Sequence, residues 1–233
     1  MAKEEKKVIL VIVEGPTDES ALGMIFKEFF SDNNTKFHVC HGDITTQNYI
    51  SSDEIVKKVY EQVEIVKSKY RYSDDVFLKI IHLTDTDGVF IQDGYVKHAE
   101  VQEITYYETH MESVDVQQTV DRNHRKAQNL RKLFSCNTIK DIPYKLYFNS
   151  CNLEHVLYGK LNNFSDEEKQ EMADDFSERY EEDIQGFLQF LKESNAEVQG
   201  DYRETWKFIQ KSLNSLNRHT NLHLVFEVYN KKM

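Results

Sequence analysis

Two strongly apolar runs limit the folds open to this chain more than any other feature of its sequence. Residues 8–13 read VILVIV and residues 76–83 read VFLKIIHL, and acidic residues with a glycine follow each run closely. Strands that are apolar along their whole length belong inside a parallel sheet, where helices cover both faces. The sequence therefore predicts an α/β fold with a parallel sheet flanked by helices.

Helical patterns and a shorter strand alternate with these runs. Residues 18–30 place apolar side chains three and four positions apart, which is the spacing of one helix face, and Thr17 is the predicted N-cap. A short strand is predicted at 36–40 and a second helix at 52–70. This β–α–β–α–β order predicts right-handed crossovers in one parallel sheet.

Residues 89–143 are predicted to be an insertion into this α/β core. The insertion contains a helix at about 116–134 that is rich in Arg and Lys. A fourth strand at 144–148 and a helix from 153 to 161 then resume the alternation. We therefore assign residues 1–163 to the core.

Residues 164–233 are predicted to be a mainly helical C-terminal extension. An acidic helix with a regular apolar stripe is expected over 166–193, and a further helix over 202–216. The alternating residues 222–229 are expected to form a short terminal strand.

The net charge argues against one way of holding nucleic acid. The chain has 233 residues, of which 39% are apolar, and its formal net charge is −11. Proteins that hold nucleic acid by general phosphate neutralisation carry a surplus of Lys and Arg instead. A nucleic-acid substrate would therefore need bound divalent cations or a basic partner protein to offset the acidic charge.

The cysteines and the first residues indicate the compartment. Cys40, Cys136 and Cys151 are isolated and odd in number, which fits a reducing cytosol and disfavours disulfides or a zinc site. The charged residues 1–7 lead directly into the first apolar run, which is too short to span a bilayer and lacks a signal-peptide cleavage pattern. We expect a cytoplasmic protein with no membrane segment.

Four carboxylates are expected to meet at one edge of the predicted sheet. Glu14 directly follows the first apolar run, and Asp18 lies one helical turn later. Asp85 and Asp87 follow the second run, and the carboxyl ends of parallel strands share one edge. Ionised carboxylates tolerate such crowding only beside cations, and their hard oxygens select Mg²⁺, Mn²⁺ or Ca²⁺ over zinc.

The same residues carry a resemblance to a known family. A strand, Glu-Gly, an acid four residues after the Glu, and a strand with Asp-Thr-Asp-Gly about seventy residues later resemble the Toprim domain of topoisomerases, primases and nucleases. The E-x-x-x-D spacing resembles the OLD-type nucleases. The segment FNSCNLEHVL at 148–157 is similar to the S-N-P-x-F-E segment of RloB-like proteins. The resemblance covers roughly residues 6–163 and implies a Toprim-like core.

The resemblance implies roles for five acidic residues. Glu14 matches the Toprim glutamate, a general acid or base in some members and a metal ligand in the OLD type. Asp85 and Asp87 match the D-x-D pair, expected to bind metal and take part in catalysis. Asp18 and Glu154 match further metal ligands, and the expected cofactor is Mg²⁺ or Mn²⁺.

The chain departs from the pattern at two points. Cys151 and Asn152 stand where RloB-like proteins usually carry Asn-Pro. OLD-type nucleases also use a downstream lysine, for which Lys145 and Lys160 are candidates.

The resemblance implies a metal-dependent nuclease acting on DNA or RNA, in the manner of a phage-defence effector that works with an ATPase partner. The chain has no G-x-x-x-x-G-K-[ST] motif, so we expect any nucleotide-driven gating to come from that partner. The basic helix is expected to contact the phosphate backbone. Its predicted nucleic-acid-binding residues are Arg122, Arg125, Lys126 and Arg131.

Other interpretations of the same residues remain open. Asp-Thr-Asp-Gly also suits a simple turn, and Asp18 and Glu154 also suit first helical turns, where acids favour the helix dipole. The basic helix could equally be a solvated face. The alternative functions are a primase-like or RNA-maturation enzyme, or a non-catalytic binding or regulatory module; a topoisomerase would need a further cleavage domain.

Overall fold

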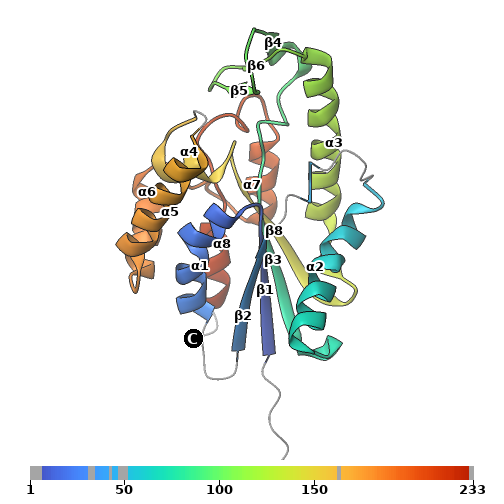
Figure 1. Ribbon diagram of the computed structural model, residues 1–233, viewed down its shortest axis with the longest axis vertical. Helices are drawn as coiled ribbons and strands as arrows, with labels where there is room; N and C mark the ends of the chain where they lie inside the picture. Colours follow the sequence, from blue (N-terminus) through green and yellow to red (C-terminus); the bar gives the residue numbers. More distant parts are fainter. Residues whose placement is uncertain (1–6, 31–34, 42–43, 47–51, 162–163, 231–233) are drawn as a thin grey trace, which may run out of the picture.

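The computed structural model describes residues 7–30, 35–41, 44–46, 52–161 and 164–230. Its main sheet has five strands in the order β2-β1-β3-β8-β7, and helices flank both faces (Figure 1). The strands are β1 (Lys7–Val13), β2 (Thr35–His41), β3 (Phe77–Asp85), β7 (Thr138–Ile139) and β8 (Ile142–Asn149). Only the β7–β8 pair of this sheet is antiparallel. The predicted α/β fold with a helix-flanked sheet is confirmed, and the sheet is mostly parallel, with β7 as an antiparallel edge strand that was not predicted.

Alternate residues of β1 pack into two separate apolar clusters, one on each face of the sheet. Residues Val8, Leu10 and Ile12 belong to one cluster, and Ile9, Val11 and Val13 belong to the other. Because successive side chains of a strand point to opposite faces, burial on both sides requires an apolar residue at every position. This requirement explains the unbroken VILVIV run.

Two groups of helices supply these clusters. The first cluster receives side chains from α2 (Ile55–Tyr70), α3 (Val116–Ser135) and α7 (Tyr202–Ile209). The second receives them from α1 (Pro16–Phe30), α4 (Leu153–Tyr158), α5 (Asp166–Tyr180), α6 (Ile184–Glu193) and α8 (His223–Asn230). In Figure 1, α2 and α3 lie on one side of the strands and α1, α5 and α6 on the other. None of the helices in the described ranges is long and apolar enough to cross a bilayer.

The direction of the chain through the sheet reverses between β1 and β3. From β1 the chain passes through α1 to β2 on one side, and it then passes through α2 to β3 on the other side of β1. In open α/β sheets, such a reversal leaves a crevice beyond the carboxyl ends of the two strands. The ends of β1 and β3 are therefore where a site is expected.

A small second sheet lies beyond the carboxyl ends of the main strands (Figure 1). It has the order β4-β6-β5, formed by β4 (Val96–His98), β5 (Thr105–Tyr106) and β6 (Met111–Ser113). Short 3₁₀ helices precede β3 and β4, at Asp74–Val76 and Asp93–Tyr95. The predicted insertion thus contains both this sheet and α3, and α3 also covers one face of the main sheet.

The predicted terminal strand at 222–229 is wrong, because this segment forms α8. Leu222, Val225 and Phe226 are fully buried, and their spacing of three and four is that of a helix face. Phe226 stacks on Phe26 of α1 with ring centroids 5.8 Å apart. A short apolar run fits a strand and a buried helix equally well, and here packing against α1 decides the outcome.

The start of α1 also differs from the prediction. The helix begins at Pro16, so Thr17 lies inside the first turn and is not the N-cap. Proline suits the first helical position, where its missing N–H costs no hydrogen bond. The carboxylate of Asp18 accepts a hydrogen bond from the backbone N–H of Gly15 at 2.8 Å, which satisfies a donor at the helix start.

Two predicted C-terminal helices are shorter than expected. The acidic helix is broken into α5 and α6 by residues 181–183, where Glu182 has a φ of 58° and Asp183 caps α6 through the N–H of Gly186. The next helix, α7, ends at Ile209, well before Leu216. The regular apolar stripe of 166–193 survives because both halves pack on the same face.

Gly88 tests the close packing of the turn after β3. Its φ is 63°, and an added Cβ would meet the side chains of Leu216 and Met111. We expect Gly88→Ala to lower the free energy of unfolding by about 2 kcal/mol, from strain and overpacking. Urea unfolding measures this change.

Gly94→Ala is the matched control, because nothing lies within 4 Å of its added Cβ. This variant should change the free energy of unfolding by less than about 0.5 kcal/mol. Equal stabilities of the two variants would contradict the tight packing at Gly88.

Candidate active site

Glu14 is held at the end of β1 by groups from three other segments. Its Oε1 accepts hydrogen bonds from the hydroxyl of Thr84 at 2.6 Å and from the backbone N–H of Asp85 at 3.0 Å. The ammonium of Lys126 lies 3.4 Å from the same oxygen, and Thr45 donates to it at 3.5 Å. The carboxylate therefore bridges β1, β3 and α3 across the crevice.

Lys126 is the residue of this site that the sequence analysis misplaced. It is fully buried, so it does not belong to an exposed basic face of α3. Its ammonium also lies 2.7 Å from the Oδ2 of Asp87. A buried lysine needs such partners, because an unpaired charge away from water is costly. Lys126 thus joins two of the predicted metal-binding carboxylates.

A signal for this lysine exists in the sequence. Lys126 precedes Leu130 by four residues and Leu133 by seven, so it falls within the buried stripe of α3. The earlier candidates lie elsewhere: Lys145 stands over the ring of Tyr202 at 4.3 Å, and Lys160 over the ring of Phe164 at 5.7 Å. A charged residue in an apolar stripe, with acids expected nearby, was the available clue.

Asp85 is the acid on which the other four predicted acids converge. It ends β3, and burial is the first cause that raises the pKa of its carboxyl well above the usual range. The further causes are the negative charges of Glu14, Asp18, Glu154 and Asp87. Its Oδ1 accepts a hydrogen bond from the side-chain amide of Asn149 at 3.3 Å. The structure therefore brings the other four acids within electrostatic range of Asp85.

Asp18 and Glu154 approach Asp85 from the first turns of two helices. Asp18 is buried in α1, and burial first, then the charge of Glu154, raises the pKa of its carboxyl to about 6. Glu154 stands in the first turn of α4 and faces Lys169 of α5, with 3.9 Å between charged atoms. Both acids also favour their helix dipoles, so the dipole interpretation and a role at the site are compatible here.

The loop that carries Asp87 is tied to α3 by an arginine. Arg122 donates to the backbone carbonyl of Asp87 and to the hydroxyl of Tyr106, both at 3.2 Å. Asp87 itself has a φ of 45°, and its N–H donates to the carbonyl of Cys151 at 2.9 Å. Asp-Thr-Asp-Gly is therefore a turn, as one interpretation had it, and the turn fixes Asp87 beside the lysine.

The predicted nucleic-acid-binding arginines take different positions along α3. Arg122 and Arg125 line a pocket of about 400 Å³ between α3 and the small sheet, next to Asp87. Arg131 is exposed, and its guanidinium lies over the ring of Phe90 at 5.4 Å. The structure thus brings Arg122 to the border of the acid cluster, and Arg125 lines the pocket beside Arg122.

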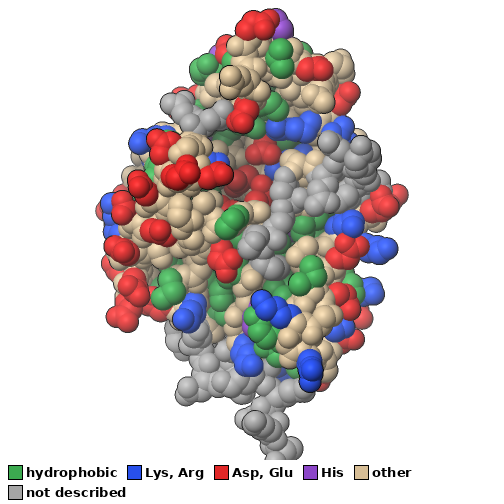
Figure 2. Space-filling model, in the orientation of Figure 1, with side chains coloured by type: hydrophobic (Ala, Val, Ile, Leu, Met, Phe, Trp, Pro, Cys, Tyr) green, Lys and Arg blue, Asp and Glu red, His purple; other side chains and the backbone are tan. Residues whose placement is uncertain are grey.

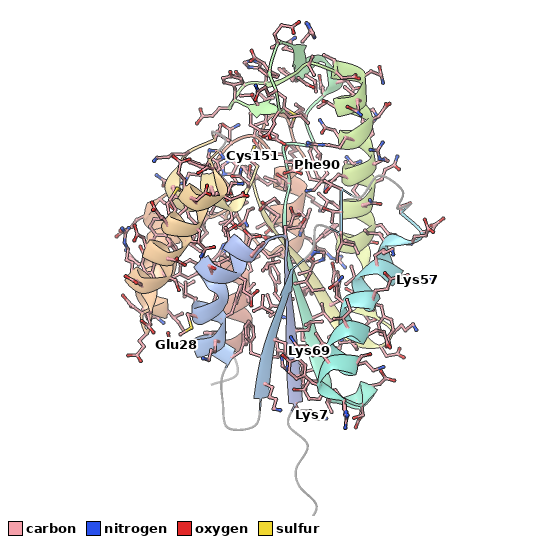
Figure 3. All side chains as sticks on the ribbon, in the orientation of Figure 1. Lys7, Glu28, Lys57, Lys69, Phe90 and Cys151 are labelled. Carbon is pink, nitrogen blue, oxygen red and sulfur yellow. The ribbon has the colours of Figure 1, made fainter. Side chains whose placement is uncertain are left out.

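The surface over this cluster is hollowed. Figure 2 shows red acidic side chains recessed above the strand ends, with blue side chains at the upper border of the hollow. Phe90 and Cys151, labelled in Figure 3, mark this end of the sheet. The side chains of Glu14 and Asp87 keep 15% and 23% of their surface exposed.

The acids fit a hard divalent cation by chemical type. Their carboxylate oxygens are the ligands that Mg²⁺ and Mn²⁺ prefer. Among the described residues, however, no three Asp, Glu, His or Cys side chains lie close enough together to hold a metal ion. The ammonium of Lys126 stands between Glu14 and Asp87, and Asn149 holds Asp85. Metal binding therefore requires these side chains to turn toward one another.

Comparison with known proteins gives no relative for this chain. No protein-family model, curated protein or solved structure matches it. The function is therefore argued from the site and its chemistry.

Asp85→Asn tests the repulsion among the acids. In EDTA at pH 7 to 8, we expect this variant to unfold about 2–4 °C above the wild type, a change of about 1 kcal/mol. The physical reason is that the folded protein opposes ionisation of Asp85, whose pKa is raised, whereas the unfolded chain does not. The advantage should shrink as the pH falls through the folded pKa toward the unfolded one, because the wild-type carboxyl then becomes neutral.

Asp75→Asn is the control for this measurement. Asp75 is exposed just before the amino end of β3, away from the cluster. Thermal unfolding in EDTA should show no stabilisation for this variant. A lower unfolding temperature for Asp85→Asn at pH 8 would contradict the proposed repulsion.

Lys126→Met tests the role of the buried ammonium. The substitution leaves Glu14 and Asp87 without their shared cation, so we expect a loss of about 3 kcal/mol in the free energy of unfolding in EDTA. Lys132→Met, at an exposed position of the same helix, should leave the free energy of unfolding nearly unchanged. Urea unfolding compares them, and equal stabilities would show that the Lys126 contacts contribute nothing.

Proposed function

We propose that this protein is a metal-dependent nuclease with a Toprim-like core that hydrolyses phosphodiester bonds in DNA or RNA. The observation that carries the proposal is the convergence of four further acids on Asp85 at the β1–β3 crevice, together with a buried lysine that contacts two of the five. A purely structural cluster of this charge would destabilise the fold with no compensating gain. Clusters of perturbed acids in an open crevice are typical of catalytic sites.

The acids fall into two groups on the two sides of the sheet. Glu14 lies on the side of α3 with Lys126 and Asp87. Asp85, Asp18 and Glu154 lie toward α1 and α4. This division supports different tasks for the two groups within one site.

Asp85, Asp18 and Glu154 would hold the cation, with Asp87 and Glu14 at its border. Bound Mg²⁺ or Mn²⁺ would supply a polarised water and neutralise charge on the phosphate. Glu14 would accept a proton from the attacking water, because its carboxylate is fixed by four hydrogen-bond donors and faces the same crevice.

Lys126 and Arg122 would stabilise negative charge on the phosphate. As the water oxygen bonds to phosphorus and the ester P–O bond breaks, charge grows on the phosphate oxygens and on the leaving oxygen. The ammonium of Lys126 has three donor hydrogens, and it already stands between two acids of the site. Arg122 lies beside Asp87 and can donate two parallel hydrogen bonds to a phosphate.

The wider setting of the activity is part of the same proposal. The isolated cysteines suit a reducing cytoplasm, and the absence of a nucleotide-binding motif in the sequence suits an effector that works with a separate ATPase in phage defence. A basic partner would also offset the net charge of −11 when nucleic acid approaches.

The test is cleavage of single-stranded DNA, duplex DNA and RNA in Mg²⁺ or Mn²⁺. We expect cleavage by the wild type that EDTA stops, and rates at least about 100-fold lower for Glu14→Gln, Asp85→Asn and Asp87→Asn. Gel analysis of end-labelled strands measures the rates and identifies the substrate class.

Asp75→Asn is again the matched control and should cleave like the wild type. Product analysis also distinguishes a primase-like reaction, which would consume nucleotides and lengthen strands. Undiminished cleavage by both Asp85→Asn and Asp87→Asn would overturn the assignment of the site. Tight divalent-ion binding without turnover on any of the three substrates would contradict a nuclease acting alone.

A further inference from the structure

A compact group of aromatic and cationic side chains lies at the opposite end of the sheet from the acids. The ring of His38 lies 4.2 Å from that of Tyr70, and the rings of Tyr70 and Tyr72 stack with centroids 5.6 Å apart. The ammonium of Lys36 stands 5.5 Å from the Tyr72 ring, and that of Lys69 5.3 Å from the Tyr70 ring. We call these five residues the tyrosine–lysine patch.

The end of α2 explains how the rings come together. Arg71 has a φ of 56°, a left-handed conformation that ends the helix, and its N–H donates to the carbonyl of Lys67. The chain turns back there, and the hydroxyl of Tyr72 reaches the Nε2 of His38 at 2.9 Å. Tyr72 also packs on Phe77 in the core. The patch is thus anchored to the fold from beneath.

The patch is locally positive although the chain is acidic. Lys36 and Lys69 are exposed, and in the described part of the chain neither forms an ion pair. Lys67 beside them is engaged by Glu64 and Asp74. Burial first, and then the charges of Lys36 and Lys69, lower the pKa of His38. With a net charge of −11 for the whole chain, two exposed cations beside stacked rings are a distinct feature.

The patch faces the same side of the sheet as Glu14. Phe37 and Val39 of β2 pack beneath α1, so Lys36 and His38 project to the other side, toward α2. Ile12 packs on that side, and Glu14 follows it by two positions. His38 pairs in register with Leu10, so it lies four residues before the level of Glu14, or about 13 Å along the strands.

The location at an outer strand leaves the patch open to a ligand. β2 is the last strand on its side of the sheet. Figure 2 shows blue, green and purple side chains together below the red hollow, and Lys69 is labelled at this end of the molecule in Figure 3. Tyr70 keeps 43% of its surface exposed.

We propose that the tyrosine–lysine patch binds single-stranded nucleic acid and anchors the strand whose phosphodiester lies at the acid cluster. Exposed tyrosine rings offer stacking surfaces to unpaired bases, and flanking lysines neutralise the phosphates between them. Bases inside a duplex are already stacked on each other, so the patch selects single strands. This inference rests on the proposed function, because it names the form of substrate that the nuclease holds.

The experiment measures binding of fluorescein-labelled oligodeoxythymidine and oligouridine by fluorescence anisotropy in EDTA, where no cleavage occurs. For Lys36→Gln with Lys69→Gln, we expect weaker binding and a slope of log affinity against log salt that is smaller by about 1.4, since each phosphate contact contributes about 0.7 for single strands. Tyr70→Ala should weaken binding roughly tenfold with an unchanged slope, because it removes a stacking surface and no charge.

Two control variants separate the patch from general effects. Tyr70→Phe keeps the ring and should bind like the wild type. Lys207→Gln with Phe208→Ala removes an exposed cation and ring from α7 and should also leave binding unchanged. Unaltered affinity and salt slope for both patch variants would overturn the proposal. Loss of binding to phosphatidylserine vesicles alone, with oligonucleotide binding retained, would overturn it in favour of a lipid surface.

Kinetics distinguish failure of the patch from failure of the nuclease. In Mn²⁺ the patch variants should raise the KM for long single strands and leave kcat unchanged. If the patch variants cleave with an unchanged KM, the proposed role of the patch is contradicted and the nuclease proposal stands. If binding in EDTA depends on the patch but no substrate is cleaved in Mn²⁺, the proposed role of the patch in binding stands and the nuclease proposal is contradicted.

Discussion

Repulsion among carboxylates at the β1–β3 crevice is the constraint on which this end of the molecule depends. Glu14, Asp85 and Asp87 approach one another because the strands that carry them run parallel and side by side. Among the described residues, the buried ammonium of Lys126 compensates two of the acids, Arg122 lies beside Asp87, and Lys169 faces Glu154. The cluster is thus only partly neutralised by the protein, and a divalent ion would complete the balance.

The chain order and the apolar patterns were enough to predict most of the core. The VILVIV run placed β1 in the interior, and the spacing of apolar residues gave α1, α2 and α3 to within a few positions. The prediction of a terminal strand failed because Leu222, Val225 and Phe226 are all fully buried, and periodicity cannot tell such a helix from a strand. The break between α5 and α6 was not predicted, because a single left-handed residue, Glu182, leaves the apolar stripe intact.

The acids of the site were predictable because each follows a strand or opens a helix, and these positions are fixed by topology. Lys126 was not, since its role depends on which face of α3 meets the sheet. Its charge suggested solvent, yet its place between apolar positions of the helix indicated burial. The tyrosine–lysine patch could not be predicted from the sequence either, because only the fold brings β2 and the end of α2 together.

Helix α3 joins two parts of the site in one rigid body. Arg122, which touches the Asp87 loop and Tyr106 of the small sheet, and Lys126, which touches Glu14, stand one turn apart on it. This helix has 20 residues, and its apolar side packs on the main sheet. One packed helix therefore sets the positions of the two cations that contact Asp87 and Glu14. The apolar core and the charge balance of the acids thus depend on the same element.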